Sequence, residues 1–247
     1  MSITAIIGGS GLYELEGLNN RSEIVSIDTQ WGEASATIVY GELNGAEVMF
    51  LARHGIPHRI PPHKVNYRAN LQALKDAGAD RIIAINAVGG IHTEMGPEVL
   101  VVPDQIIDYS WGREHTFFAE NLTEVVHVDF SQPYSESLRQ QLLLAAKRLR
   151  LDVVERGVYG CTQGPRLESA AEVDRLERDG VDIIGMTAMP EAALARELEM
   201  EYATLALVVN WAAGRTEQPI TMDDIHQVIA SGMSQVTSLL SETLKAG

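Results

Sequence analysis

The chain has 247 residues and a formal net charge of −15, which disfavours a nucleic-acid partner because phosphate backbones are bound by clustered Lys and Arg. Its one cysteine, Cys161, excludes an intramolecular disulfide, and we favour a small buried side chain over a nucleophile at this position. No apolar run approaches the roughly 20 residues of a membrane helix and no signal peptide is recognised, so we expect one cytoplasmic domain over residues 1–247, without a membrane partner.

The N-terminal residues 3–7 predict a strand that ends in a glycine-rich turn at residues 8–11. A dinucleotide fingerprint fails here, because Glu14 stands where the third glycine is needed, and no Gly-Lys-Ser/Thr of a phosphate loop is present. The N–H groups of such a turn and the Ser10 hydroxyl suit an anion. A plain tight turn explains the same residues equally well.

Residues 22–51 indicate a meander of strands with a hairpin turn at Asn44-Gly45. Arg53 and His54 follow its last strand, and they form a candidate phosphate pair because guanidinium binds phosphate with two contacts. The sequence places two further histidines, His58 and His63, close behind them.

These three neighbouring histidines, at positions 54, 58 and 63, raise the possibility of a metal site. The prolines between them exclude a helix that would align them, and no carboxylate or cysteine joins them. We therefore favour a rigid basic loop over a metal site, and the sequence assigns no role to His58 or His63.

The middle of the chain alternates helical and strand patterns. Asn66 caps a predicted helix that ends at Gly78, and residues 82–85 predict a strand buried on both faces, hence parallel, followed by a turn of small residues at 86–90. Further strands are predicted at residues 99–103 and 105–108, an irregular loop at 111–121, a helix at 135–149 and another strand at 153–159. Glu168, after the next turn, is on its own explained as an acid in a first helical turn.

Residues 182–214 predict a strand, a turn, a helix and a second strand. Thr187 occupies the helix N-cap position and Pro190 an early helical position, so this turn is a candidate anion site. The second strand, at residues 202–209, ends at Asn210, whose amide both donates and accepts. A long C-terminal helix follows, capped by Thr221.

Seven segments now occur in one order, GGSGL, RHG, NYRAN, NAVGG, GPRLES, GMTAMPE and VVN, and cover nearly the whole chain. This set resembles the trimeric nucleoside phosphorylases, the family of purine nucleoside and methylthioadenosine phosphorylases. The resemblance implies a single α/β domain with a central mixed, partly barrel-like β-sheet flanked by helices. It also implies a homotrimer, or a dimer of trimers, that cleaves a purine nucleoside with inorganic phosphate as co-substrate and without metal or organic cofactor.

The resemblance also implies roles for individual residues. Phosphate-binding positions fall on Ser10, Arg53, His54, Asn86, Ala87 and Thr187. Sugar- and base-binding positions fall on Met186, Leu167, Glu168, Asn210, Trp211 and Ala212, with Asn210 also contacting the leaving purine. His127 matches a position that reaches into the neighbouring subunit's site, and Leu167 replaces a base-stacking Phe.

Two positions bear on the purine. Family members that act on 6-aminopurines carry Asp at the place of Asn210 and again at the place of Ala212. Glu168 matches the acid that receives N1–H in the 6-oxopurine enzymes. An amide donates to a 6-oxo group and accepts from N7–H, which an ionised Asp cannot do, so both residues indicate hypoxanthine or guanine.

The sugar end indicates a different class of nucleoside. Enzymes that take a 5′-hydroxyl carry a His where the alignment places Ile225, with Met222 one turn before it. An apolar wall suits a methylthio group, although ordinary core packing explains both residues equally well. A one-residue shift in the alignment would put His226 there instead, which on a regular helix lies about 100° away.

Together the two ends predict phosphorolysis of S-methyl-5′-thioinosine to hypoxanthine and 5-methylthioribose 1-phosphate, a purine-salvage reaction. Alternatives within the family are a methylthioadenosine phosphorylase and a general inosine or guanosine phosphorylase. A non-catalytic nucleoside-binding protein would use the same pockets, whereas a nicotinamide oxidoreductase would need the fingerprint that fails here.

Overall fold

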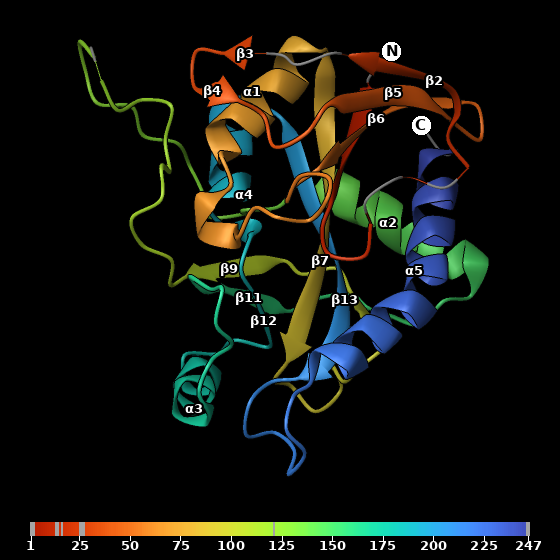
Figure 1. Ribbon diagram of the computed structural model, residues 1–247, viewed down its shortest axis with the longest axis vertical. Helices are drawn as coiled ribbons and strands as arrows, with labels where there is room; N and C mark the ends of the chain where they lie inside the picture. The colour runs from red at the N-terminus through yellow and green to blue at the C-terminus, as the bar shows by residue number, and fades with distance from the viewer. Residues whose placement is uncertain (1–2, 13–14, 16, 25–27, 121, 246–247) are drawn as a thin grey trace.

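The computed structural model describes residues 3–12, 15, 17–24, 28–120 and 122–245. Strands and helices alternate along most of the chain (Figure 1). The strands are β1 (Ile3–Gly8), β2 (Asn19–Ile24), β3 (Asp28–Thr29), β4 (Gly32–Glu33), β5 (Ile38–Leu43), β6 (Ala46–Ala52), β7 (Ala79–Gly90), β8 (Leu100–Val101), β9 (Gln105–Asp108), β10 (Val153–Val154), β11 (Val158–Cys161), β12 (Ile183–Gly185) and β13 (Glu201–Trp211). The helices are η1 (Pro62–Lys64), α1 (Tyr67–Asp76), α2 (Glu136–Leu149), α3 (Ala170–Arg178), α4 (Ala188–Glu197) and α5 (Met222–Leu244).

Eleven of the described strands form one mixed sheet whose main path runs β10-β8-β13-β7-β1-β6-β5-β2. Strand β7 lies at its centre and pairs in parallel with both β1 and β13. Near its end β7 also pairs with β12 in the antiparallel sense, and β11 connects β12 to β9. The α/β fold with a central mixed sheet flanked by helices, expected from the sequence, is thereby confirmed.

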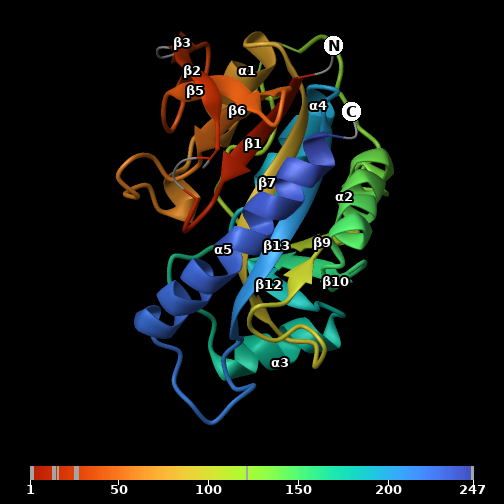
Figure 2. The ribbon, with the colours of Figure 1, turned by 90° about the vertical axis from the view of Figure 1, so that its right-hand side faces the viewer.

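Helices cover both faces of the central strands. Side chains at alternate positions, such as Ile6 and Ile83, pack with α2 and α5, while their neighbours Ile7 and Ile82 pack with α1 and α4. Figure 2 shows α5 lying along β13 and β7 with α2 beside it. Burial on two faces explains why residues 82–85 read as a continuous apolar run rather than an alternating one.

Two strands differ from the sequence-based prediction. The small residues 86–90 belong to β7 and do not form a turn, because β13 pairs in parallel with them as far as Trp211. The register shifts between Val208 and Asn210, a bulge that redirects the end of β13. The single strand expected at residues 153–159 is divided into β10 and β11.

The predicted helix caps at Asn66 and Thr221 are confirmed, since each side chain accepts a backbone N–H of the first turn. Helix α3 begins after Ser169, which forms a capping box with Glu172. Glu168 therefore lies outside the helix, and its interpretation as a first-turn acid is wrong. The loop predicted at residues 111–121 is irregular as far as the structure describes it, and its last residue, Asn121, lies outside the described residues.

Candidate active site

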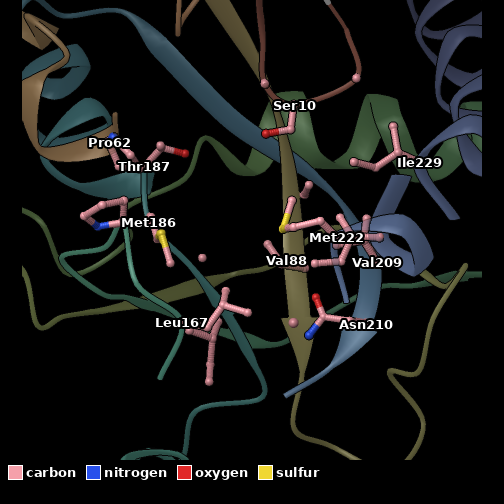
Figure 3. A pocket seen from close by; sticks show the side chains of 18 of the residues that line it. Ser10, Pro62, Val88, Leu167, Met186, Thr187, Val209, Asn210, Met222 and Ile229 are labelled. Carbon is pink, nitrogen blue, oxygen red and sulfur yellow. The ribbon is translucent and has the colours of Figure 1, made fainter. Parts of the chain in front are cut away.

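A cavity of about 980 Å³ lies beside the ends of β1, β6, β7, β12 and β13, and α5 closes one of its sides. Most of the residues to which the resemblance assigns a role line this cavity: Ser10, Arg53, His54, Ala87, Leu167, Glu168, Met186, Thr187, Asn210, Ala212, Met222 and Ile225. Figure 3 shows Thr187 and Met186 on one side of it, with Asn210 and Met222 opposite. Chain segments that lie far apart in the sequence thus meet around one space large enough for a nucleoside and phosphate.

The expected phosphate-binding residues Ser10, Arg53, His54 and Thr187 line one part of the cavity, which we call the anion end. The glycine-rich turn after β1 belongs to it. A Cβ added to Gly9 would lie 2.5 Å from the carbonyl oxygen of Ile85 and 3.1 Å from Nη1 of Arg53. Gly11 has a φ of +86°, and a Cβ there would lie 2.0 Å from Ile229 on α5. Both glycines are required for this close packing of the turn against β7, Arg53 and α5.

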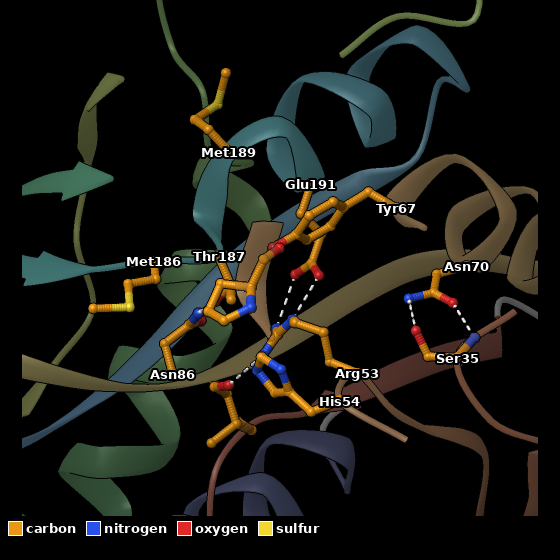
Figure 4. Close-up of polar contacts among 12 residues, drawn as sticks. Ser35, Arg53, His54, Tyr67, Asn70, Asn86, Met186, Thr187, Met189 and Glu191 are labelled. Atoms are coloured by element: carbon orange, nitrogen blue, oxygen red, sulfur yellow. Dashed lines mark hydrogen bonds and ion pairs between the residues drawn. The ribbon is translucent and has the colours of Figure 1, made fainter. Parts of the chain in front are cut away.

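Arg53 is held at this end by a buried carboxylate that the sequence analysis missed. Its Nε and Nη2 donate to the two oxygens of Glu191 at 2.7 and 2.9 Å, and its Nη1 donates to the carbonyl of Ile85 at 3.1 Å (Figure 4). Tyr202 donates a further hydrogen bond to Glu191. Burial alone would lower the pKa of Arg53, but the adjacent Glu191 carboxylate raises this pKa above its ordinary value. The guanidinium is therefore charged and fixed in orientation.

His54 is neutral and has a defined tautomer. Its Nδ1 lies 2.8 Å from the carbonyl oxygen of Ile60, so this nitrogen carries the proton and donates it. Burial and the neighbouring Arg53 charge lower the pKa of His54 to about 4. The ring stacks on His58 with centroids 4.5 Å apart. At neutral pH His54 therefore adds hydrogen-bonding capacity to the anion end but no charge.

Thr187 is positioned by Asn86 and does not serve as a helix cap. The Nδ2 of Asn86 donates to Oγ1 of Thr187 at 2.7 Å, and the Thr187 side chain makes no capping hydrogen bond. Met189 has non-helical backbone angles, so the regular part of α4 does not begin at Thr187. Helix α4 thus begins after Thr187 as expected, but the Thr187 hydroxyl contacts Asn86 and does not cap the helix.

Glu168 and Asn210 face the other end of the cavity. Glu168 accepts a hydrogen bond from the Thr162 hydroxyl at 2.5 Å. Asn210 follows the bulge in β13, and its Nδ2 donates to the carbonyl of Trp211 at 2.7 Å. Gly89 opposes it, and a Cβ on Gly89 would lie 3.4 Å from that same nitrogen. The Asn210 amide is thus anchored through one N–H, and its oxygen and second N–H remain available.

The wall on the α5 side is mainly apolar. Ile225 is 8% exposed and lines the cavity together with Ile220 and Ile229. Met222 lines the same wall but is 57% exposed. His226, which is exposed, also lines the cavity.

Three of the residues assigned from the resemblance lie outside the cavity. Asn86 is buried behind Thr187 and acts through it. Trp211 lies away from the lining, and its indole packs where a Cβ on Gly96 would approach it to 2.7 Å. His127 is exposed and lies between β9 and α2, and Figure 1 shows part of this connection projecting from the body of the molecule.

Arg113 holds together the segments that follow β11 and β12, a role that the sequence did not indicate. It is buried and donates to four carbonyl oxygens, those of Thr162, Gln163, Met186 and Met189, at 2.6 to 3.1 Å. These carbonyls belong to the segments that follow β11 and β12. The same segments carry Glu168 and Met186, the residues expected to contact the base and the sugar. A lone arginine in an aromatic loop gave no sequence signal for this role.

Cys161 is fully buried, and burial raises the pKa of its thiol to about 12, as expected for a packing residue. Among the described residues, no group of three or more His, Cys, Asp or Glu side chains is arranged to hold a metal ion. Within the same part of the chain, no helix is long and apolar enough to cross a membrane.

Comparison with known proteins places the chain in a family. The model of the phosphorylase superfamily matches residues 3–245. The chain belongs to the phosphorylase superfamily. Among curated relatives of this superfamily, a probable S-methyl-5′-thioinosine phosphorylase of Pseudomonas syringae pv. tomato is 58% identical over 246 residues, covering 100% of each chain.

Two further superfamily members mark the range of similarity. The 6-oxopurine nucleoside phosphorylase of Pyrococcus furiosus is 46% identical over 96% of this chain and 89% of its own. The solved structure of Schistosoma mansoni methylthioadenosine phosphorylase in complex with adenine superposes with a TM-score of 0.93 at 31% identity, covering 100% of this chain and 91% of that one. The identification of the chain as a nucleoside phosphorylase from its motifs is confirmed.

Proposed function

We propose that this phosphorylase cleaves S-methyl-5′-thioinosine with inorganic phosphate. A phosphate oxygen forms a bond to C1′ of the sugar while the bond from C1′ to purine N9 breaks. The proton of hydrogen phosphate is formally transferred to the purine, giving hypoxanthine and 5-methylthioribose 1-phosphate. This assignment places the protein in purine salvage.

One observation carries the proposal: Glu168, Asn210 and the apolar residues Ile225 and Ile229 of α5 all line one cavity. A carboxylate accepts N1–H, which a 6-oxopurine carries and a 6-aminopurine lacks. The Asn210 amide matches a 6-oxo group and N7–H. Buried polar groups left unpaired by the wrong base would discriminate strongly against it.

The apolar wall supports the methylthio half of the assignment. Ile225 is buried in the cavity wall next to Ile229, whereas His226, which also lines the cavity, is exposed. A 5′-hydroxyl against Ile225 and Ile229 would lose its hydrogen bonds to water without replacement. A methylthio group there would instead bury apolar surface.

The remaining residues supply binding and charge stabilisation. Bond cleavage develops positive charge on the sugar and negative charge on the purine, so phosphate held beside C1′ acts as nucleophile and as electrostatic stabiliser. Ser10, Arg53, His54 and Thr187 provide its donors and fixed dipoles. Met186 lies beneath the sugar, and Asn210 contacts the departing purine at N7.

Several wider features belong to the same proposal. We infer that residues 1–247 act as one catalytic domain in the cytoplasm, with phosphate as co-substrate and no resident cofactor. We also infer a homotrimer, or a dimer of trimers, in which the exposed His127 reaches a neighbouring site. The exposed apolar residues of the same segment, Leu122, Val125, Val126 and Val128, suit burial against a second copy of the chain.

Phosphate dependence tests the reaction class. Purified protein is incubated with S-methyl-5′-thioinosine with and without phosphate, and hypoxanthine and sugar phosphate are quantified. We expect base release only with phosphate, and one sugar phosphate for each hypoxanthine. Nucleoside binding without release would support a non-catalytic binding protein, and release without phosphate would indicate a hydrolase.

A further inference from the structure

We propose that Thr162 is a positioning residue that holds the Glu168 carboxylate in place as a hydrogen-bond acceptor and thereby contributes to the preference for 6-oxopurines. The inference rests on the proposed function of Glu168 in binding the base. Thr162 follows β11, is half-buried and does not itself line the cavity, but its hydroxyl donates to Glu168, which does. It belongs to none of the motifs that carry the family resemblance.

The backbone of Thr162 is held from two sides. Its N–H donates to the carbonyl of Gly185 at 2.8 Å, and its carbonyl accepts from Nη2 of Arg113 at 3.1 Å. Gly185 ends β12, immediately before the site residues Met186 and Thr187. The position of the Thr162 side chain is therefore fixed relative to the cavity floor.

The direction of the hydroxyl proton follows from its neighbours. Two oxygens lie near Oγ1, and both accept hydrogen bonds: Oε1 of Glu168 at 2.5 Å and the carbonyl of Gly185 at 3.4 Å. The hydroxyl has one proton, and the shorter contact takes it.

This hydrogen bond determines what Glu168 can offer a purine. One carboxylate oxygen is bound by Thr162, and the other remains free to accept N1–H of a 6-oxopurine. A 6-aminopurine presents a lone pair at N1, which repels an ionised carboxylate. Without the Thr162 hydroxyl the Glu168 carboxylate is free to rotate, so no oxygen is held toward N1–H and the discrimination should relax.

The test compares kcat/KM for S-methyl-5′-thioinosine with that for S-methyl-5′-thioadenosine. Thr162→Val removes the hydroxyl at nearly constant volume, and we expect the ratio of the two values to fall by about tenfold, as for a lost hydrogen bond to a charged group. Thr162→Ser restores the hydroxyl and should restore the ratio. Thr162→Ala removes the hydroxyl without inserting a methyl group, so it replaces the Val variant if that variant fails to fold.

Thr116 provides a matched control, because its hydroxyl also donates to a glutamate, Glu197, at 2.7 Å but outside the cavity. Thr116→Val should leave the substrate ratio unchanged. A double-mutant cycle with Glu168→Gln shows whether Thr162 acts through Glu168. In the Glu168→Gln background, Thr162→Val should have no further effect on the ratio.

The outcomes distinguish the role of Thr162 from the proposed role of Glu168 in binding the base. If Glu168→Gln lowers the ratio while Thr162→Val and Thr162→Ala leave it intact, the role of Thr162 is overturned and the base assignment stands. If Glu168→Gln also leaves the ratio intact, both are overturned. An effect of Thr162→Val that persists undiminished in the Glu168→Gln background would also overturn the inference, because Thr162 would then act by another route.

Discussion

Arg53 and Glu191 form a two-contact ion pair that is closed to solvent directly behind the anion end of the cavity. Their side chains are 1% and 0% exposed, and the shorter contact joins Nε to Oε2 at 2.7 Å. Two contacts fix the plane of the guanidinium, so its remaining N–H groups are directed before any phosphate arrives. The carboxylate also offsets the charge of Arg53, and because His54 is neutral at pH 7, we expect the anion end to bind phosphate mainly through oriented donors.

Replacing Glu191 by Gln should therefore weaken phosphate binding. An amide presents one oxygen and one N–H₂ group to the guanidinium, which loses one contact and leaves Arg53 free to reorient. We expect the KM for phosphate to rise at least about tenfold, and the free energy of unfolding to fall by on the order of 3 kcal/mol because a buried charge loses its partner. Steady-state kinetics at varied phosphate and denaturant titration measure the two effects.

Glu199→Gln is the matched control, since Glu199 is exposed just beyond the end of the same helix α4. Its phosphate KM should equal that of the parent protein. A Glu191→Gln protein with unchanged phosphate KM would contradict the positioning role of Glu191.

The pH dependence of stability should carry a contribution from His54. Its pKa is lowered from 6.5 to about 4 by burial and by Arg53, while His58 stacks on the ring and the Ile60 carbonyl holds Nδ1–H. Between these pH values His54 is protonated in the unfolded chain but remains neutral in the folded protein. The free energy of unfolding therefore falls as the pH decreases through this window, by about 3 kcal/mol over its full width.

Comparison of unfolding free energies at pH 7 and pH 4.5 isolates this contribution. The loss should be about 2 kcal/mol smaller in His54→Gln than in the parent protein. His115→Gln, which alters an exposed histidine, should leave the loss unchanged. Equal losses in the parent and in His54→Gln would contradict the neutral, buried state of His54.

The double substitution Asn210→Asp with Ala212→Asp should shift the preference toward 6-aminopurines. Carboxylates accept from an amino group and from protonated N7, and they repel a 6-oxo oxygen. We expect kcat/KM for S-methyl-5′-thioadenosine to rise relative to S-methyl-5′-thioinosine by about tenfold or more. Parallel assays of both nucleosides measure this ratio, and no relative gain with the 6-aminopurine would refute the role given to Asn210.

Ile225→His should improve the use of inosine relative to S-methyl-5′-thioinosine. Ile225 is 8% exposed and lines the cavity, so a histidine there would give a 5′-hydroxyl a hydrogen-bond partner. We expect the ratio of kcat/KM values for inosine and the methylthio nucleoside to rise about tenfold. The control Gln227→His places the same ring on an exposed position of α5; an equal gain in both variants would contradict the pocket assignment.

Local sequence rules were sufficient for some features and not for others. The hairpin at Asn44-Gly45 and the cap at Thr221 depend on neighbouring residues alone, and both are found. The extent of β7 depends on pairing with β13 more than a hundred residues away, so residues 86–90 gave the signal of a turn. A strand that continues past its apolar run is set by tertiary contacts.

The same limit applies to the candidate site. Residues at strand ends, such as Arg53 and Asn210, could be proposed because strand ends meet at one edge of a sheet. Glu191 lies in the helix predicted within residues 182–214, and Arg113 lies in the loop predicted at residues 111–121. Their partners are 138 residues away for Glu191 and about 50 to 75 residues away for Arg113, and no local pattern reports such contacts.

The central claim is that one cavity combines a 6-oxopurine end with an apolar 5′ end. The most direct test is the measurement of kcat/KM for S-methyl-5′-thioinosine, S-methyl-5′-thioadenosine and inosine at the same saturating phosphate concentration. The structure-based account predicts that S-methyl-5′-thioinosine exceeds each of the others by about tenfold or more. A higher value for S-methyl-5′-thioadenosine would contradict the roles of Glu168 and Asn210, and a higher value for inosine would contradict the role of Ile225.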